Sequence, residues 1–479
     1  MDRQIEEFIQ DYMVALRNGN AAVFAGAGLS KATGFVDWKT LLRSVTHNLG
    51  LSIDKESDLV AVTQYSINER GGRHHINQLL VDEFSRKVAI TENHKILARL
   101  PIKTFWTTNY DSLIEEALFQ SGKTPDVKIT QENLAVNKDK RDAVVYKMHG
   151  DIEQPHSAVI SKEDYENFDN ERPLFSAALQ GDIVSKTFLF IGFSFSDPNI
   201  DYILSRIRVL LGKNQRNHYC FLRKVQRKDF KKNKDFIYAQ TRQSLQIKDL
   251  RRYSITALLF DDYAEFTDVL RMIDNRIKRS KIFISGSAYK YFPWGEKKAL
   301  RFVHNLSKEL NKNGATIVTG FGLGIGSAVI NGVLEQVFST NYRHIDDQLI
   351  LRPFPQFATG SKSLPDLWQE YRAEMISGAG VAIFIFGNKK DEKDKLVRAE
   401  GMIKEFDIAI KNKLVVLPIG ATGYISAELW GKVWKERKRY LGTSKKIHSL
   451  FKQINDSERS STEIIKSLIN LVNLIQKEI

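Results

Sequence analysis

The chain has 479 residues, 42% of them hydrophobic and 27% charged, and it carries a formal net charge of +14. This length predicts two or three domains, and the lack of any apolar run near ~18 residues excludes a membrane-spanning helix. The single cysteine, Cys220, excludes internal disulfides, and the acidic N-terminus lacks signal-peptide features. We therefore expect a soluble, cytoplasmic protein with no membrane partner.

The first segment with chemical content is a strand-like run, NAAVFA at 20–25, which is followed at once by glycines. Gly26 and Gly28 form a Gly-X-Gly turn, which allows backbone N–H groups to approach a pyrophosphate without an intervening Cβ. Ala27 and Ser30 lie in the same turn, and Ser30 could bind a phosphate or cap the following helix. The full dinucleotide fingerprint is not present, so a plain tight turn is the alternative.

Two polar segments also follow strand-like runs. TTNYD at 107–111 comes after PIKTFW, and its Asn109 offers both a donor and an acceptor, whereas a turn capped by Asp111 is the simpler alternative. KMHGD at 147–151 continues the strand AVVYKM, which delivers His149 to a sheet edge. Histidine is the side chain best suited to proton transfer at neutral pH, and the other nine histidines have no comparable setting.

Together with FLFIGFSFSDPNI at 188–200, these segments resemble the sirtuin superfamily over roughly residues 1–275. The resemblance implies a site that takes NAD as substrate, with Asn109 and His149 as the catalytic pair. It also implies nucleotide contacts from residues that follow the strands, namely Gly26, Ala27, Gly28, Ser30, Asp111, Gly192 and Ser194.

The cysteine count separates the branches of this superfamily. Protein-deacylating sirtuins usually carry a structural zinc held by four cysteines, which a chain with one cysteine cannot supply. GFVDWKTLL at 34–42 also stands where the deacylating branch has its GIPxFR segment. We therefore expect no metal and favour the zinc-free sirtuin-like NAD hydrolases, with a zinc-free protein deacylase as the alternative.

The densest basic stretch, RKVQRKDFKKNK at 223–234, raises the question of nucleic acid binding. It contains a single aromatic residue, Phe230, so stacking on bases is not expected. A solvated helix or loop is the favoured interpretation, and nucleic acid is not an expected partner. The excess positive charge also favours the approach of polyanionic nucleotides to clefts.

A second strand–glycine pattern begins after a predicted helix near 270–280, which we take as the boundary between domains 1–275 and 276–479. KIFISG at 281–286 is a strand, and Gly286 and Ser287 lie in its turn. A helix over 294–314 and a strand, ATIVTG, then lead to the loop GFGLGIGS.

That loop, at 320–327, opens a helix and contains Gly322, Gly324 and Gly326. Backbone N–H groups at a helix start can form an anion cradle, and an unusually tight turn is the alternative. The later strands DQLILRPF, GVAIFIFG and LVVLPIG alternate with helices, which predicts a parallel sheet with right-handed connections.

This half resembles the SLOG group of nucleotide-sensing domains. The PGGxGTxxE segment of the related catalytic proteins is replaced here by FIFGNKKDEKDK at 384–395, so we expect ligand binding rather than catalysis. The predicted fold class is α/β with two Rossmann-like domains: an N-terminal sirtuin-like domain with helical insertions and no zinc ribbon, and a C-terminal SLOG domain with a parallel sheet.

A sirtuin-like domain followed by a SLOG domain resembles the ThsA effectors of the bacterial Thoeris antiphage system, and the similar segments reach along nearly the whole chain. The resemblance implies an NAD hydrolase that depletes cellular NAD in abortive infection. Its activator would be an isomer of cyclic ADP-ribose, made by a TIR-domain partner and bound by the SLOG domain at Gly286, Ser287, Gly322, Gly324, Gly326, Arg372, Lys389 and Glu405.

The resemblance also implies a homotetramer, for which helices at 2–17 and 198–211 offer apolar faces. A non-enzymatic nucleotide sensor is the remaining alternative to the hydrolase.

Overall fold

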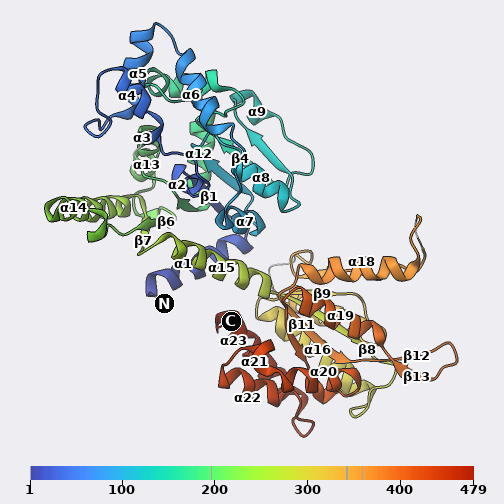
Figure 1. Cartoon of the computed structure of the whole chain (residues 1–479). Coiled ribbons are helices and arrows are strands. Elements are labelled where there is room, and N and C mark those ends of the chain that lie inside the picture. Colours follow the sequence, from blue (N-terminus) through green and yellow to red (C-terminus); the bar gives the residue numbers. More distant parts are fainter. Residues whose placement is uncertain (1, 196, 341–343, 359, 479) are drawn as a thin grey trace. The chain divides into compact units, whose positions relative to one another are not determined.

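The computed structural model describes residues 2–195, 197–340, 344–358 and 360–478. The chain divides into two compact units, Met1–Asp274 and Asn275–Ile479, and helix α15 (Tyr263–Arg279) crosses the division (Figure 1). Each unit is built around its own parallel sheet. This arrangement confirms the α/β class predicted for both halves.

Within the described residues, the N-terminal unit has a seven-stranded sheet in the order β3-β4-β2-β1-β5-β6-β7, and all of its pairings are parallel. Its central strands are entirely buried, which explains why they read as continuous apolar runs. The strands are β1 (Ala21–Ala25), β2 (Thr104–Thr107), β3 (Pro125–Lys128), β4 (Ala143–Lys147), β5 (Thr187–Ile191), β6 (His218–Arg223) and β7 (Ile255–Phe260).

The strand order reverses around β1, which lies between β2 and β5. In open parallel sheets, the crevice at the carboxyl ends of strands flanking such a reversal is where ligands bind. The loops that leave β1, β2 and β5 therefore start at one edge of the sheet.

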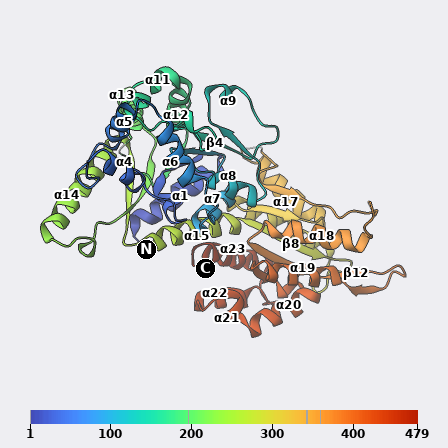
Figure 2. The same ribbon diagram turned by 45° about the horizontal axis from the view of Figure 1, so that its top comes forward.

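Helices connect these strands, and a group of them, α3 to α6, is inserted between β1 and β2 with a small core of its own that includes Leu42, Val62, Ile76 and Leu80. In both views α14 lies at the outer edge of the unit (Figures 1 and 2). The helices are α1 (Arg3–Arg17), α2 (Ala27–Lys31), α3 (Trp38–Leu41), α4 (Arg43–Asn48), α5 (Leu59–Arg70), α6 (His74–Phe84), α7 (Glu92–Arg99), α8 (Leu113–Gln120), α9 (Gln131–Ala135), α10 (Lys162–Glu166), α11 (Phe168–Glu171), α12 (Pro173–Ser185), α13 (Pro198–Leu211) and α14 (Asn233–Leu250).

The apolar face of α1 is used inside the unit. The ring of Phe8 lies 4.9 Å from that of Tyr219 on β6, and the Tyr12 hydroxyl donates to the backbone oxygen of Ala22 at 3.0 Å. The sequence predicts an apolar face on this helix, and within the unit that face packs against the sheet, while Val14 stays exposed.

Among the described residues, the C-terminal unit has a five-stranded parallel sheet in the order β10-β9-β8-β11-β14. An antiparallel hairpin, β12–β13, projects from the unit in both views (Figures 1 and 2). The strands are β8 (Lys281–Ser287), β9 (Thr316–Thr319), β10 (Leu349–Leu351), β11 (Val381–Phe386), β12 (Asn388–Lys390), β13 (Leu396–Arg398) and β14 (Val415–Pro418).

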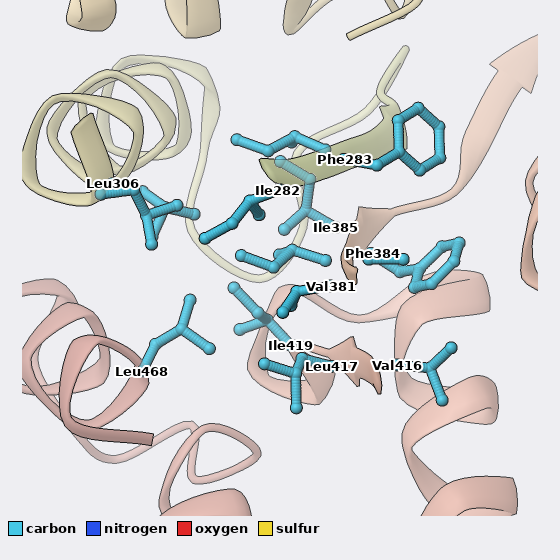
Figure 3. Packing of buried hydrophobic residues seen from close by; sticks show 14 of the residues in the cluster. Ile282, Phe283, Leu306, Val381, Phe384, Ile385, Val416, Leu417, Ile419 and Leu468 are labelled. Atoms are coloured by element: carbon cyan, nitrogen blue, oxygen red, sulfur yellow. The ribbon is translucent and has the colours of Figure 1, made fainter. Parts of the chain in front are cut away.

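Its helices cover both faces of this sheet, as the close view of the core shows (Figure 3). Ile282 and Phe283 are neighbours on β8 and point to opposite sides, Ile282 toward Leu306 of α16. On the other side, the ring of Phe384 lies 5.4 Å from that of Phe406 on α19. The helices are α16 (Glu296–Lys312), α17 (Gly326–Phe338), α18 (Leu364–Ser377), α19 (Glu400–Lys411), α20 (Tyr424–Lys435), α21 (Arg437–Leu441), α22 (Lys445–Gln453) and α23 (Ser461–Glu478).

No helix in the described part of the chain combines the length and the apolar character that crossing a bilayer would require.

Candidate active site

Loops from four strands of the N-terminal unit line one cleft with a volume of about 500 Å³. The four strands are β1, β2, β4 and β5, and the cleft lies at their carboxyl ends. The structure brings together every residue that the sequence predicts for the sirtuin-like site. They are Gly26, Ala27, Gly28, Ser30, Asn109, Asp111, His149, Gly192 and Ser194.

The glycine turn after β1 packs directly against the turn after β5. The Gly28 N–H donates to Gly192 O at 2.8 Å, and a Cβ added at Gly26 would lie 2.5 Å from the same oxygen. Gly192 has a φ of +66°, and a Cβ there would lie 2.2 Å from the backbone nitrogen of Leu29. The close approach of the two loops therefore requires these glycines. The Gly28 N–H, which the sequence predicts as part of a phosphate cradle, is already hydrogen-bonded to Gly192 O.

Asn109 is buried, and its side chain is held in one orientation. Its amide nitrogen Nδ2 donates to Gly26 O at 3.2 Å and to Ser30 Oγ at 3.0 Å. Because a backbone carbonyl can only accept, the nitrogen end of the amide must face Gly26. Both amide hydrogens are thus engaged, and the group that Asn109 retains for a ligand is its acceptor, Oδ1.

Asp111 has both of the roles that the sequence left open. It caps a helix, and it also lines the cleft. Its Oδ1 accepts from the Leu113 N–H at 3.1 Å, at the start of α8. Burial raises the pKa of the Asp111 carboxyl, while the Ser30 hydroxyl and the Lys147 ammonium act in the opposite sense. Ser30, which is also buried, accepts from Asn109 Nδ2 and lies next to this carboxylate.

Lys147 is the last residue of β4, and its side chain is fully buried. The ammonium pairs with Asp151 and lies 3.4 Å from Glu115 Oε1. Burial alone would lower the pKa of this lysine, but the two carboxylates raise it above the ordinary value, so the ammonium stays charged. The sequence analysis did not single out this residue, because a lysine at a strand end is usually exposed.

His149 lies against a carboxylate from another loop. Its Nε2 is 3.1 Å from Asp197 Oδ2, although the ring N–H does not point along a hydrogen bond to that oxygen. The ring also meets Tyr165 of α10 edge-to-face, with the ring centroids 5.5 Å apart. The imidazole is only 4% exposed, so water has little access to the pair.

Several residues that line the cleft were not predicted from the sequence. Asp197 and Tyr165 lie beside His149, while Trp38, Arg223 and Tyr263 line other parts of the wall. Only Asp197 had a visible signal, because it stands in FSFSDPNI, a segment already assigned to the site. The others come from helices and strands whose residues carry no motif.

In the C-terminal unit, the glycine loop after β9 packs against the turn after β8. A Cβ added at Gly322 would lie 1.8 Å from Gly286 O, and one at Gly324, where φ is +76°, would lie 1.9 Å from Ala288 O. Gly326 begins α17. The two predicted turns are therefore adjacent, as they are in the N-terminal unit.

Arg372 and Glu405, predicted as ligand contacts, form a partly buried pair between α18 and α19. Arg372 Nε lies 3.5 Å from Glu405 Oε1, and the guanidinium stacks over the ring of Phe354 at 4.9 Å from its centroid. Glu405 Oε2 accepts from the Ser285 hydroxyl at 2.6 Å. Burial raises the pKa of Glu405, and both Ser285 and Arg372 oppose the shift.

The remaining predicted residues of this unit are Ser287, at the end of β8, and Lys389, in the hairpin β12–β13. The Ser287 hydroxyl donates to Asn388 O at 2.8 Å, which joins the end of β8 to the hairpin. The Asn388 side chain accepts from the N–H groups of Tyr289 and Lys290, so it holds the loop after β8. Lys389 is exposed on the hairpin, next to this anchored residue.

Comparison with known proteins agrees with this two-part architecture. The SIR2-like domain family matches residues 103–246, and the Sir2- and TIR-associating SLOG family matches residues 265–475. The chain is 49% identical to "NAD(+) hydrolase ThsA" of Cytobacillus dafuensis, across 98% of this chain and 97% of that one. It is 48% identical to the protein of the same name from Bacillus cereus (strain MSX-D12), across 99% of each chain.

A third relative, "NAD(+) hydrolase ThsA" of Acinetobacter baumannii (strain 532279), is 43% identical across 96% of this chain and 97% of its own. These matches run through both units and confirm the sirtuin-like and SLOG resemblances. The chain belongs to the ThsA family.

Proposed function

We propose that this chain hydrolyses NAD⁺ to nicotinamide and ADP-ribose, with residues 1–275 as the catalytic domain and Asn109 and His149 as the catalytic pair. The observation that carries the proposal is that both side chains line one largely buried cleft together with the two glycine turns. The full-length relatives that bear the name NAD(+) hydrolase support it.

The chemistry suits these two side chains. The bond between the ribose carbon and nicotinamide breaks with both electrons passing to the cationic ring, which leaves as neutral nicotinamide. The ribose becomes oxocarbenium-like, as in glycoside hydrolysis, and a water oxygen bonds to its carbon. His149 takes the proton that this water loses. Asn109 accepts a hydrogen bond from the water or from a ribose hydroxyl through Oδ1, since its amide hydrogens are engaged elsewhere.

Nicotinamide release from NAD⁺, measured by liquid chromatography on the purified full-length chain, tests the proposal. Asn109→Ala and His149→Ala should each lower the rate by about 10²–10⁴-fold, the usual range for loss of a general base or its partner. His156→Ala is the matched control, because His156 is exposed and lies outside the cleft lining. Release by His149→Ala at the parent rate would contradict the assignment.

Adding an acyl-lysine peptide to this assay and following its acyl group, together with a measurement of NAD⁺ binding, separates the alternatives. NAD-dependent removal of an acyl group from an acyl-lysine peptide would instead support a zinc-free deacylase. Binding of NAD⁺ without nicotinamide release under every condition would support a non-enzymatic sensor.

We further propose that residues 276–479 sense an isomer of cyclic ADP-ribose and thereby activate the hydrolase. The guanidinium of Arg372 suits a phosphate through its planar fork, and Glu405 suits ribose hydroxyls as an acceptor. The adjacent turns at Gly286, Ser287, Gly322, Gly324 and Gly326 would complete the pocket, with Lys389 at its edge. The match to a Sir2- and TIR-associating family supports a TIR-domain protein as the source of the signal.

In this proposal the activated enzyme depletes NAD in the bacterial cytoplasm during abortive infection by phage. It works as a homotetramer, which would require an apolar face outside the core. Helix α13 offers one, because Val209 is 80% exposed and Leu210 is 74% exposed.

A further inference from the structure

Asp197 lies beside His149, the proposed catalytic base, but it is not one of the site residues that the sequence predicts. Its Oδ2 lies 3.1 Å from His149 Nε2 and accepts from the Tyr165 hydroxyl at 3.4 Å. The carboxylate side chain is 9% exposed, and the imidazole is 4% exposed. A negative charge this close to an imidazole acts strongly, because little water lies between or around the two groups.

The position of this carboxylate is fixed independently of His149. Its other oxygen, Oδ1, accepts from the N–H groups of Asn199 at 2.9 Å and Ile200 at 3.2 Å, so Asp197 caps the N-terminus of α13. An N-cap holds its side chain in one geometry. Oδ2 is therefore presented to His149 by the start of a 14-residue helix rather than by a mobile loop.

Asp197 is negatively charged, which suits it to stabilise a neighbouring imidazole that gains a proton. Burial alone would raise the pKa of its carboxyl, but the His149 imidazole and the two backbone N–H groups hold that pKa below the ordinary value. The carboxylate is therefore ionised throughout the neutral range.

The other titratable side chains near His149 and Asp197 do not take the role of Asp197. Tyr165 of α10 and Tyr110 of the loop after β2 carry hydroxyls whose pKa is raised by burial, so both are neutral. Asp164 is engaged with Arg73 at 2.6 Å. Arg172 donates to backbone oxygens of the surrounding loops, among them Met148 O at 3.2 Å.

We propose that Asp197 is a positioning residue of the hydrolase site, which orients the His149 ring and stabilises the imidazolium that forms when His149 accepts the proton from water. This inference rests on the proposed NAD⁺ hydrolysis. Because one ring nitrogen faces Asp197, the other nitrogen is left to take that proton. The proton is released to solvent after the products leave, and Asp197 itself stays ionised throughout.

The test is Asp197→Asn in the full-length chain, with kcat and KM for NAD⁺ measured from pH 5 to pH 9, with and without each cyclic ADP-ribose isomer. Asparagine is also a good N-cap, so α13 should remain in place. We expect kcat to fall by about 10–10⁴-fold, as when a catalytic histidine loses its carboxylate, with less than about a threefold change in KM. The acid limb of kcat/KM should move to lower pH, because the imidazole loses the negative charge that favours its protonated form.

Two further variants guard against a loss that is merely structural. Asp197→Ser keeps a capping oxygen but cannot reach His149, and it should reproduce the Asp197→Asn phenotype. Asp58→Asn changes the N-cap of α5, where Asp58 Oδ1 accepts from the Ala61 N–H at 3.0 Å. Asp58 itself does not line the cleft, although its neighbour Leu59 does, and this variant should leave kcat and the pH profile unchanged.

The outcomes separate this inference from the proposed function. If His149→Ala is inactive while folded Asp197→Asn and Asp197→Ser keep the parent kcat and acid limb, the role of Asp197 is wrong and the hydrolase stands. If Asp58→Asn loses as much kcat as Asp197→Asn, the effect belongs to helix capping and the inference is also wrong. If His149→Ala releases nicotinamide at the parent rate, the hydrolase assignment itself fails.

Discussion

The Lys147 ammonium donates a 2.6 Å hydrogen bond to the backbone oxygen of Asp111. It also donates to the oxygen of Tyr110 at 3.1 Å, so a side chain at the end of β4 holds the loop that carries Asn109. His149 follows Lys147 by two residues. One buried charge thus ties together the two loops that supply the proposed catalytic pair.

Lys147→Met should destabilise the N-terminal unit strongly. The substitution leaves the carboxylates of Glu115 and Asp151 buried without their cation, and breaking a buried ion pair typically costs about 3–5 kcal/mol. Urea unfolding followed by circular dichroism measures the loss. Lys162→Met is the control, because the Lys162–Glu166 pair is exposed and should contribute less than about 0.5 kcal/mol. Equal unfolding midpoints for the two variants would contradict this account.

Gly192→Ala should also destabilise the N-terminal unit, by at least about 2 kcal/mol. The residue has a left-handed φ, and the new Cβ would collide with the Leu29 backbone, so both strain and displacement add to the cost. Gly181→Ala is the matched control. Gly181 lies within α12 with open space around it, and alanine there should stabilise the helix by about 0.5–1 kcal/mol. Opposite shifts of the two melting temperatures are the expected result.

Arg372→Ala should weaken stimulation by the proposed activator, an isomer of cyclic ADP-ribose. Loss of a charge-assisted contact to phosphate should raise the activator concentration that gives half-maximal nicotinamide release by about 10–100-fold. Arg439→Ala is the control, because that arginine is exposed and pairs with Glu436 on the surface at 2.7 Å. Identical activation curves for the parent and Arg372→Ala would rule out a role for Arg372 in sensing.

Stability of the N-terminal unit should fall as the pH is lowered through the range of histidine titration. Burial lowers the pKa of His94 to about 4 and that of His218 to about 3. Unfolded histidine titrates near 6.5, so below that pH the unfolded chain binds protons that the folded chain does not. The free energy of unfolding therefore decreases from about pH 6.5 downward, by about 3 kcal/mol for His94 at pH 4.

Urea unfolding at pH 7.5 and pH 5 checks this sign. His94→Leu should reduce the difference between the two pH values, whereas His47→Leu should not, because His47 is exposed. Greater stability of the parent at pH 5 than at pH 7.5 would mean that other groups dominate.

Leu210→Glu should weaken the proposed assembly. Leu210 is 74% exposed on α13, and a charge at the centre of an apolar interface opposes association. Light scattering coupled to size-exclusion chromatography measures the mass. Phe119→Glu on α8 is a control of similar exposure, 76%, on a helix not implicated in assembly. A parent that runs as a monomer would contradict the tetramer, and an unchanged mass for Leu210→Glu would exclude α13 from the interface.

The sequence by itself determined the features that depend on neighbours along the chain. Apolar runs of five or six residues predicted β1 and β11, because strands buried in a parallel sheet are apolar on both faces. The strand-like segments AVVYKM and KIFISG predicted β4 and β8. Gly26, directly after β1, and Gly286, near the end of β8, predicted turns. The resemblance to sirtuins implied that Asn109 and His149 act as a pair. The two residues do line one cleft, because the carboxyl ends of parallel strands meet at one edge of the sheet.

Only the tertiary structure decided which charges are buried and what they touch. Lys147 reads as an ordinary strand-end lysine, yet it is enclosed because α8 brings Glu115 to it. Asp197 lies in a segment that the sequence assigned to the nucleotide site without a role of its own, and its contact with His149 appears only when the loops after β4 and β5 converge. Burial and pairing of charges depend on which distant segments pack together, and no local pattern of residues encodes that.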